Sequence, residues 1–384
     1  MLLNRTDITS GWGPHGKRVL RLLAANGPMS RERLHRLSGL HRNLLGDTVR
    51  RLIDDGLVRS GAPQVRGRGR PRTPVTLDLS RRYILGVAIE PGAVRTCKVN
   101  LSREIVGEPI AVPVKADALG IAAETIRKLA DADALAIGVS ITGVIDPERQ
   151  LVLESSSVAS APADLSPLRE APDDIPLVIE NDLHALAMHW QMHYGARRDE
   201  DVLLVCLDDG AMGAALLVQG TPHSGCVHAA NEIGHTCLAV DTPTCYCGRR
   251  GCLERIFDSA YARALDGSTM GLKERFAACG RMDEAALRIL YLTSCGIANA
   301  VNLMKPHRLV LVSPFAKHAD FRTLLAGAIE GEMLASLRER VAIDWWREPT
   351  QAPAVVAACP ALAFVLGEQS ASPAALRRVA AARN

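Results

Sequence analysis

Residues 232–254 have the sequence EIGHTCLAVDTPTCYCGRRGCLE, which is the most informative stretch of the chain. One histidine and three cysteines lie within eighteen residues, namely His235, Cys245, Cys247 and Cys252. An imidazole and three thiolates form a closed tetrahedral set for Zn²⁺, and thiolate-rich ligation favours zinc over magnesium or calcium. Four protein ligands leave no open position, so the stretch predicts one structural Zn²⁺ per chain. The alternative, a set of core thiols, does not explain this ordered spacing. Cys237 falls outside the spacing and is expected to be a spectator.

The composition is that of a globular protein with two or three domains. The chain has 384 residues, of which 48% are hydrophobic and 23% charged. It contains no apolar run of about 18 residues or more and no secretory signal, so we expect no membrane span and a cytoplasmic location. In that compartment the ten cysteines are expected to be thiols or metal ligands.

The charge is distributed unevenly along the chain. Residues 1–80 contain 15 Lys and Arg against 6 Asp and Glu, a balance of +9, whereas residues 81–384 contain 30 against 36, a balance of −6. A small basic segment attached to a mildly acidic body indicates a nucleic-acid-binding module, although a solvated basic tail would have the same charge.

The pattern of residues 1–80 favours the module. Apolar spacing predicts helices at 15–25, after Ser30 and at 41–55, with a turn at Ser38-Gly39-Leu40 between the last two. Strands are expected at 57–59 and 74–79, on either side of a basic run. Three short helices followed by a basic hairpin predict a winged helix-turn-helix domain over residues 1–80.

Two sets of side chains in this domain are suited to DNA. On the third helix, four polar side chains lie off the apolar face: Arg42, Asn43, Asp47 and Arg50. Arg and Asn can pair with the edges of guanine and adenine. In the predicted wing, four arginines alternate with glycine or proline and suit phosphates or the minor groove: Arg66, Arg68, Arg70 and Arg72. This run also resembles an AT-hook, but its position between two strands favours the wing.

Residues 81–384 alternate between strand and helix patterns and show no internal sequence repeat. Buried strands are expected at 83–89, 94–101, 104–109, 134–140, 176–179, 202–207, 214–219 and 308–312. Helices are expected at 116–129, 183–194 and 283–304, and from 353 through at least 366. This order predicts an α/β fold for the second domain, residues 81–384.

The zinc motif resembles the signature of the ROK family (repressors, open reading frames and sugar kinases). Glu180-Asn181-Asp182, the glycine-rich segment 210–220 and segment 299–312 resemble further family elements in the expected order. Gly56-Leu57-Val58 and the arginine run resemble the winged domain of the family's repressors. The resemblance implies an actin/hexokinase-like (ribonuclease H-like) body of two α/β lobes with a sugar cleft between them.

The resemblance also implies an effector-binding set: Asn181, Asp182, Glu232, His235 and Glu254. Carboxylates and an amide suit the hydroxyls of a sugar, and the zinc ion would fix the loop that carries three of these residues. In the family's kinases the residue matching Asp182 is the general base. Asn181-Asp182 can also be the N-cap of a helix that follows a strand, and both roles are compatible.

Three turns depart from the pattern of the family's kinases. The first, at residues 89–94, keeps one glycine and contains Pro91, which lacks a backbone donor. The second has Ala211 and Met212, and the third has Val312-Ser313-Pro314-Phe315 in place of a glycine pair. Because phosphoryl transfer depends on positioning, these changes predict that it is lost and that no residue is catalytic. The sugar-side segment 155–161 also departs from the family, which leaves the effector open.

The sequence thus predicts a transcription repressor that binds a double-stranded DNA operator and a sugar or sugar derivative. A homodimer or homotetramer would place two winged domains on a pseudo-palindromic site. Two alternatives remain: an ATP-dependent sugar kinase with a DNA-binding appendage, and a regulator controlled by a protein partner.

Overall fold

The computed structural model describes residues 12–61, 73–146, 149–155, 157–158, 161–169, 175–194, 199–225, 229, 231–277, 282–346 and 353–368. By its contacts the chain divides into two compact units, and each is described by itself below. The first comprises residues 1–185 and 352–384, and the second comprises residues 186–351. The predicted boundary at residue 80 lies inside the first unit, between two strands, and stays a prediction.

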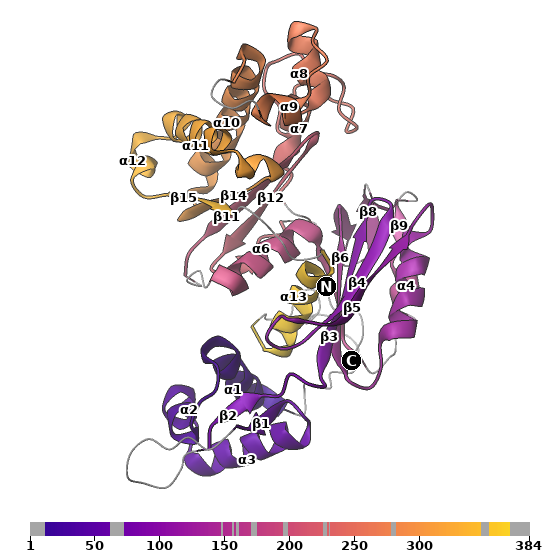
Figure 1. The fold of residues 1–384 in the computed structure, drawn as a ribbon, viewed down its shortest axis with the longest axis vertical. Helices are drawn as coiled ribbons and strands as arrows, with labels where there is room; N and C mark the ends of the chain where they lie inside the picture. Colours follow the sequence, from indigo (N-terminus) through magenta and orange to yellow (C-terminus); the bar gives the residue numbers. More distant parts are fainter. Residues whose placement is uncertain are drawn as a thin grey trace. The chain divides into compact units, whose positions relative to one another are not determined.

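The chain begins with three short helices and a two-stranded hairpin (Figure 1). These are α1 (Gly13–Asn26), α2 (Arg31–Ser38), α3 (Arg42–Asp54), β1 (Val58–Ser60) and β2 (Val75–Leu77). Ser30 caps α2 by accepting a hydrogen bond from the Arg33 backbone N–H (3.2 Å), as the sequence predicts. Gly39, with a φ of 66°, makes the turn before α3. The described part of residues 1–80 therefore contains three helices and two paired strands, an arrangement consistent with the predicted domain.

The next strands form a five-stranded sheet in the order β10-β6-β3-β4-β5. Its strands are β3 (Tyr83–Glu90), β4 (Ala93–Val99), β5 (Ile105–Pro113), β6 (Ala134–Ile141) and β10 (Leu177–Asn181). Strands β3, β4 and β5 are antiparallel, whereas β6 and β10 run parallel to β3. A small sheet and a helix come between β6 and β10: β7 (Val144–Asp146), β8 (Leu151–Glu154), β9 (Ala163–Asp164) and α5 (Ser166–Arg169).

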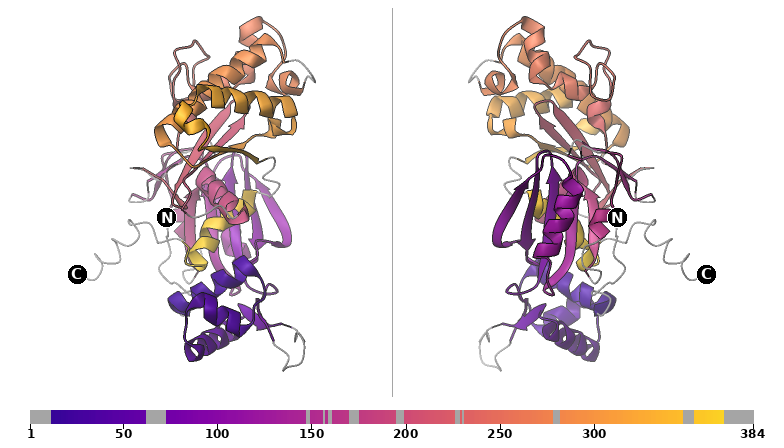
Figure 2. Two further views of the ribbon diagram at one scale, coloured as in Figure 1. Left: turned by 90° about the vertical axis from the view of Figure 1, so that its left-hand side faces the viewer. Right: turned by 90° about the vertical axis from the view of Figure 1, so that its right-hand side faces the viewer.

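Two helices pack on this sheet. The side chains of α4 (Ala118–Leu129) join a core with alternate β3 residues such as Leu85 and Val87. The other face of β3 and β6 meets α13 (Pro353–Val365), which lies along the sheet in Figure 2. Gly86 and Gly138 allow this approach, since a Cβ on either would lie about 2 Å from a carbonyl oxygen of α13.

The second unit has a sheet of the same topology, in the order β13-β12-β11-β14-β15. Its strands are β11 (Val202–Asp208), β12 (Ala211–Val218), β13 (Thr221–Pro222), β14 (Arg308–Val312) and β15 (Ala342–Trp346). The first three are antiparallel, and the last two run parallel to β11. The helix α6 (Asp182–Tyr194) leads from one unit into the other. Two copies of one sheet order agree with the predicted two-lobed fold.

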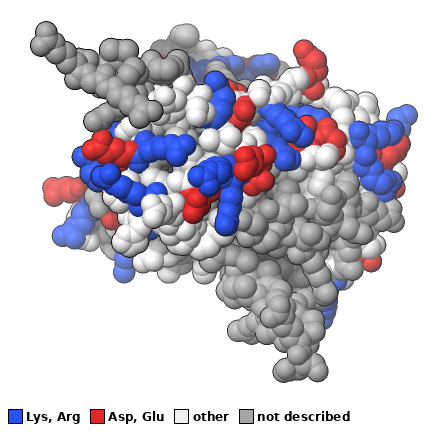
Figure 3. Space-filling view, turned by 90° about the horizontal axis from the view of Figure 1, so that it is seen from below, with Lys and Arg blue, Asp and Glu red and all other residues white. Residues whose placement is uncertain are grey.

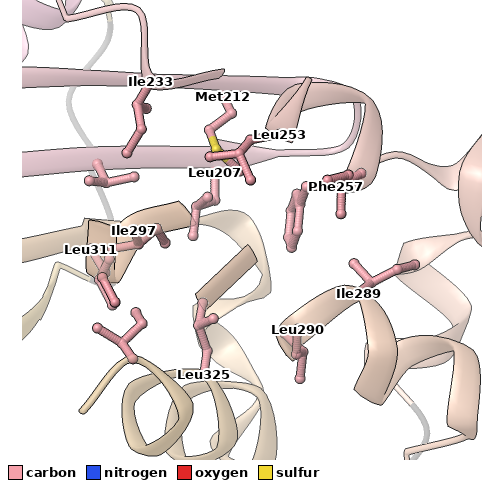
Figure 4. Packing of buried hydrophobic residues seen from close by; sticks show 14 of the residues in the cluster. Leu207, Met212, Ile233, Leu253, Phe257, Ile289, Leu290, Ile297, Leu311 and Leu325 are labelled. Carbon is pink, nitrogen blue, oxygen red and sulfur yellow. The ribbon is translucent and has the colours of Figure 1, made fainter. Parts of the chain in front are cut away.

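Helices cover one face of the second sheet (Figure 1). They are α7 (Leu253–Ile256), α8 (Ser259–Asp266), α9 (Leu272–Ala277), α10 (Glu284–Met304), α11 (Ala319–Glu332) and α12 (Ala335–Arg338). Short 3₁₀ turns lie at Ile233–His235 (η2) and Pro314–Lys317 (η3). Figure 4 shows Leu207 and Met212 of the sheet facing Ile297 and Leu325 of the helices. Among the described residues, α10 alone is long and apolar enough to cross a membrane, and its apolar side packs in this core.

Candidate functional site

The four predicted zinc ligands lie together in the second unit. Their ligand atoms all lie within 4.8 Å of one another. Cys245 Sγ is 3.6 Å from His235 Nδ1, and Cys247 Sγ is 3.6 Å from Cys252 Sγ. Tetrahedral bonds of about 2.0–2.3 Å to Zn²⁺ place ligand atoms about 3.5–3.8 Å apart. These four residues could therefore hold a four-coordinate metal ion.

The backbone of residues 245–252 forms a tight knuckle that presents these sulfurs. The Gly248 N–H donates to the Cys245 carbonyl oxygen (2.9 Å), and Gly248 and Gly251 have φ angles of 84° and 82°. A hydrogen bond from the Arg249 backbone lowers the pKa of Cys247 to about 7. This favours the thiolate that binds metal.

His235 is oriented by its second ring nitrogen. With Nδ1 aimed at Cys245, its Nε2 lies 2.7 Å from the Tyr246 hydroxyl. A metal-bound imidazole commonly hydrogen-bonds through its other nitrogen, which fixes the ring. Tyr246 supplies that contact and was missed at the level of sequence, although its position between two ligand cysteines could have indicated it.

The two glutamates of the predicted effector set flank the knuckle. Glu232 is partly exposed, and its Oε2 lies 3.9 Å from His235 Nε2. Glu254 is buried at the start of α7, where burial raises the pKa of its carboxyl group and a hydrogen bond from the Met212 backbone lowers it. Gly234 lets the η2 turn pass close to β12, since a Cβ there would lie 2.2 Å from the Met212 carbonyl oxygen. The segment that carries the four candidate ligands thus also places Glu232, His235 and Glu254.

Asn181 and Asp182 lie in the first unit, at the end of β10. Asn181 is buried: its Oδ1 accepts from the Leu183 and His184 backbone N–H groups, and its Nδ2 donates to the Gly143 carbonyl oxygen (2.9 Å). These contacts place Asn181 as a cap at the start of α6, the compatible second role that the sequence suggests.

Asp182 is half-buried, and burial raises the pKa of its carboxyl group. The Thr142 hydroxyl donates to Asp182 Oδ2 (2.7 Å), and Ser155 donates to the Thr142 carbonyl oxygen (2.5 Å). Thr142 was not predicted as a site residue. It follows β6, and parallel neighbours β6 and β10 end at one edge of the sheet.

The four predicted DNA-contacting residues of α3 are all exposed: Arg42, Asn43, Asp47 and Arg50. Arg50 Nη1 lies 3.2 Å from Asp47 Oδ1, so the carboxylate helps to orient the guanidinium. The turn before α3 is held by a 2.6 Å hydrogen bond between His35 Nδ1 and the Leu40 carbonyl oxygen. The buried side of α3, with Leu45, Val49 and Leu52, packs in the module.

The view in Figure 3 shows Lys and Arg side chains interspersed with Asp and Glu side chains. The predicted wing arginines lie outside the described residues: Arg66, Arg68, Arg70 and Arg72.

Comparison with known proteins adds to this geometry. The model of the ROK family matches residues 106–337, which is more than half of the chain. The chain belongs to the ROK family. The DNA-binding transcriptional repressor Mlc of Escherichia coli is 26% identical over 85% of this chain and 87% of its own length. The xylose repressor of Caldicellulosiruptor bescii is 23% identical over 76% of this chain and 81% of its own length.

Solved ROK structures share the fold. A ROK transcriptional regulator described as a homologue of E. coli Mlc matches with a TM-score of 0.74 at 20% identity and covers 91% of this chain and 96% of its own. The ROK hexokinase of Thermus thermophilus matches with a TM-score of 0.59 at 20% identity and covers 75% of this chain and 100% of its own. The actin/hexokinase-like fold that the sequence predicts is confirmed.

Within this ROK fold, the three altered turns have distinct surroundings. The β3–β4 turn is Pro91-Gly92, and beside it Glu90 Oε2 accepts from Arg95 Nε (2.7 Å). The β11–β12 turn carries Asp209, which accepts hydrogen bonds from Ser259. Met212 points into the core beneath that turn (Figure 4). After β14, Phe315 is buried beside Phe276, with ring centroids 5.2 Å apart.

Proposed function

We propose that this protein is a DNA-binding transcription repressor that senses a sugar or sugar derivative without phosphorylating it. The observation that carries the proposal is the helix α3, which presents Arg42, Asn43 and Arg50 to solvent on a helix-turn-helix module joined to a ROK body. The protein would act in the cytoplasm as a homodimer or homotetramer on double-stranded DNA. The predicted domains, residues 1–80 and 81–384, divide these two tasks.

The relatives support the regulatory role. Their names include a transcriptional repressor, xylose repressors and N-acetylglucosamine repressors. Because residues 1–80 are about a fifth of the chain, the match to a ROK regulator over 91% of it must include part of that segment. The match to the ROK hexokinase of Thermus thermophilus covers only 75% of this chain. These coverages favour a regulator with an added DNA-binding module.

For the effector, we propose the predicted set of Asn181, Asp182, Glu232, His235 and Glu254. A sugar hydroxyl can donate to a carboxylate and accept from an amide or imidazole N–H. Asp182 Oδ2 accepts from the Thr142 hydroxyl and Oδ1 accepts from the Leu183 backbone N–H, so a sugar hydroxyl would donate to a remaining lone pair of this carboxylate. Asn181 would act by positioning its neighbours, since its Nδ2 and Oδ1 atoms already form hydrogen bonds with the backbone.

We propose that the metal is one structural Zn²⁺ per chain, held by His235, Cys245, Cys247 and Cys252. The 3.6 Å spacings and the closed ligand set support a role in positioning the loop. Native mass spectrometry should find one zinc per chain. A folded protein without metal would contradict this assignment.

Loss of phosphoryl transfer is supported by the residues that occupy two of the altered turns. At the β3–β4 turn, Pro91 lacks the backbone N–H that could donate to a phosphate group. The buried Phe315 ring occupies the place where the kinases of the ROK family have a glycine pair. Turnover of ATP with any hexose would contradict the proposal.

The DNA-binding role can be tested by selecting sites from a random duplex pool with the full chain and measuring affinity for the selected duplex. The double variant Arg42→Ala/Asn43→Ala should weaken specific binding by at least about tenfold, since a base contact is worth about 1–3 kcal/mol. The matched control is Arg288→Ala, which removes an exposed arginine of α10. Equal affinity of the double variant and the control for the selected duplex would show that Arg42 and Asn43 of α3 do not contribute to DNA binding.

The sensing role can be tested by thermal shift against sugars, amino sugars and their phosphates, with and without Mg-ATP. A ligand that binds only the folded state raises the melting temperature by mass action. We expect a hit that is independent of ATP and that Asp182→Asn weakens. A hit that requires ATP would favour the kinase. The absence of any hit would favour control by a protein partner.

A further inference from the structure

Cys237 lies directly opposite the zinc ligand Cys252. The two residues form an isolated antiparallel bridge in the backbone. The hydrogen bonds that flank the pair, 2.8 and 3.0 Å long, join the neighbours of the cysteines and not the cysteines themselves. In such a non-hydrogen-bonded pair the two side chains approach most closely. Cys237 is therefore placed by the fold against one sulfur of the metal site.

The two cysteines are placed so that their sulfurs could form a disulfide bond. The sulfurs of Cys237 and Cys252 are 3.9 Å apart. A non-hydrogen-bonded pair has a Cα separation of about 4.5 Å, which lies within the range of about 4.4–6.8 Å that disulfides span. Rotation of the two side chains would bring the sulfurs to the bonding distance of about 2.05 Å. The backbone need not move.

The two thiols differ in exposure and in role. Cys237 is exposed, whereas Cys252 is fully buried and belongs to the ligand set. A dissolved oxidant therefore reaches Cys237 first. Cys237 is also outside the four-residue cluster, so metal binding does not occupy its sulfur.

We propose that Cys237 and Cys252 form a peroxide-sensitive pair whose disulfide releases the zinc ion. This inference rests on the zinc site proposed above. The Cys237 sulfur attacks one oxygen of hydrogen peroxide, the O–O bond breaks, and a sulfenic acid and water form. The Cys252 thiolate then attacks the sulfenic sulfur and displaces hydroxide, which takes a proton from the solvent and becomes a second water. The two sulfurs give up two electrons and the peroxide accepts them, while the Cys237 thiol and the solvent each supply one of the protons that leave in the two waters. A zinc ion held by these four residues would keep its charge and lose one of its ligands.

The release would reach the effector residues. Cys252 is the N-cap of α7, and Glu254 is the second residue of that helix. His235, which precedes Cys237 by two residues, would lose its metal bond as well. Under oxidising conditions the protein would therefore hold its effector less tightly, and a thiol reductant with added zinc would restore it.

The test uses the full chain, purified with its metal and treated with hydrogen peroxide. Zinc release is followed with a chromogenic chelator, and the disulfide is located by mass spectrometry of peptides from the non-reduced protein. We expect loss of one zinc per chain together with a Cys237–Cys252 crosslink, both reversed by dithiothreitol and zinc. The variant Cys237→Ser should keep its zinc at the peroxide dose that empties the wild type. The matched control, Cys295→Ser, removes a cysteine of α10 outside the ligand set and should behave as the wild type.

Equal zinc release from Cys237→Ser and the wild type, or a crosslink confined to the ligand cysteines, would overturn the inference. Protein that holds no metal before oxidation would instead overturn the zinc site and with it the release. The peptide map would still show separately whether Cys237 and Cys252 join. Neither result bears on DNA binding by α3, so failure of the redox pair is distinguishable from failure of the proposed regulator.

Discussion

Replacing Gly86 by alanine is expected to separate α13 from the first sheet. The added Cβ would lie 1.9 Å from the Ala354 carbonyl oxygen, and at Gly138 it would lie 2.1 Å from that of Ala357. Ordinary contacts to a Cβ are 3.4 Å or longer, so the helix would have to retreat by more than about 1 Å. The opposing atoms are backbone atoms, which cannot rotate away. Overpacking of this kind costs about 1–3 kcal/mol, and we expect the upper half of that range for either substitution.

The assay is chemical denaturation followed by circular dichroism. The control is Gly327→Ala on α11, where no atom lies within 4 Å of the added Cβ and alanine should stabilise the helix by about 0.5–1 kcal/mol. Because Gly86 and Gly138 meet the same helix, the double variant should cost less than the sum of the single variants. A Gly86→Ala protein as stable as the wild type would refute the close packing of α13.

Three further predictions concern buried polar groups and thiols. Burial raises the pKa of Asp182 above 3.8, so the folded protein loses stability as the pH rises through the folded-state pKa and this carboxyl group ionises. Asp182→Asn should therefore stabilise the protein at neutral pH, and thermal melts should show this gain vanishing below about pH 4. Asn181→Ala should cost about 1 kcal/mol in urea unfolding, because it removes the cap of α6. Burial raises the pKa of Cys97 and Cys359 to about 12, so iodoacetamide at pH 7 should label neither thiol in the folded protein and both after unfolding, as peptide mass spectrometry would show.

Local sequence patterns predicted most of the elements well. The strand β14 has the predicted bounds, Arg308–Val312. The helix α4 begins at Ala118 and not at 116 because Asp117 caps it through the Gly120 N–H (2.9 Å). Apolar periodicity and caps are local properties, so they are visible without the fold.

Elements that depend on tertiary packing were missed. The helix α11 contains two glycines that weaken its pattern, yet Phe321, Leu325 and Ile329 hold it on the core. The strands β7 to β9 have two to four residues each and depend on pairing with one another. At the sites, the ligand set was predictable because its members are close in sequence. The contact of Thr142 with Asp182 was not, since forty positions separate the two residues.

Within the first unit, the helix α13 offers a physical route between the proposed effector residues Asn181 and Asp182 and the proposed DNA-binding module. It packs on β6, the strand that ends beside Thr142, through the close approach at Gly138. At its other end, Phe364 lies beneath Lys17 of α1, with the Nζ atom 5.0 Å from the ring centroid. Arg21 of α1 donates to the Gly367 carbonyl oxygen (3.4 Å).

A change at the end of β6 could therefore be carried by a tightly packed helix to α1. We predict that Phe364→Ala keeps the effector-dependent thermal shift and the DNA affinity without effector, but loses at least part of the change in DNA affinity that the effector causes. The matched control, Phe321→Leu, alters an aromatic residue in the core of the second unit and should leave the change in DNA affinity intact. Because coupling is a free energy between two sites, affinity must be measured with and without effector for each variant. If Phe364→Ala responds to the effector as fully as the wild type, the signal does not pass through this contact. The position of α13 between the two sites would then not be evidence that it couples them.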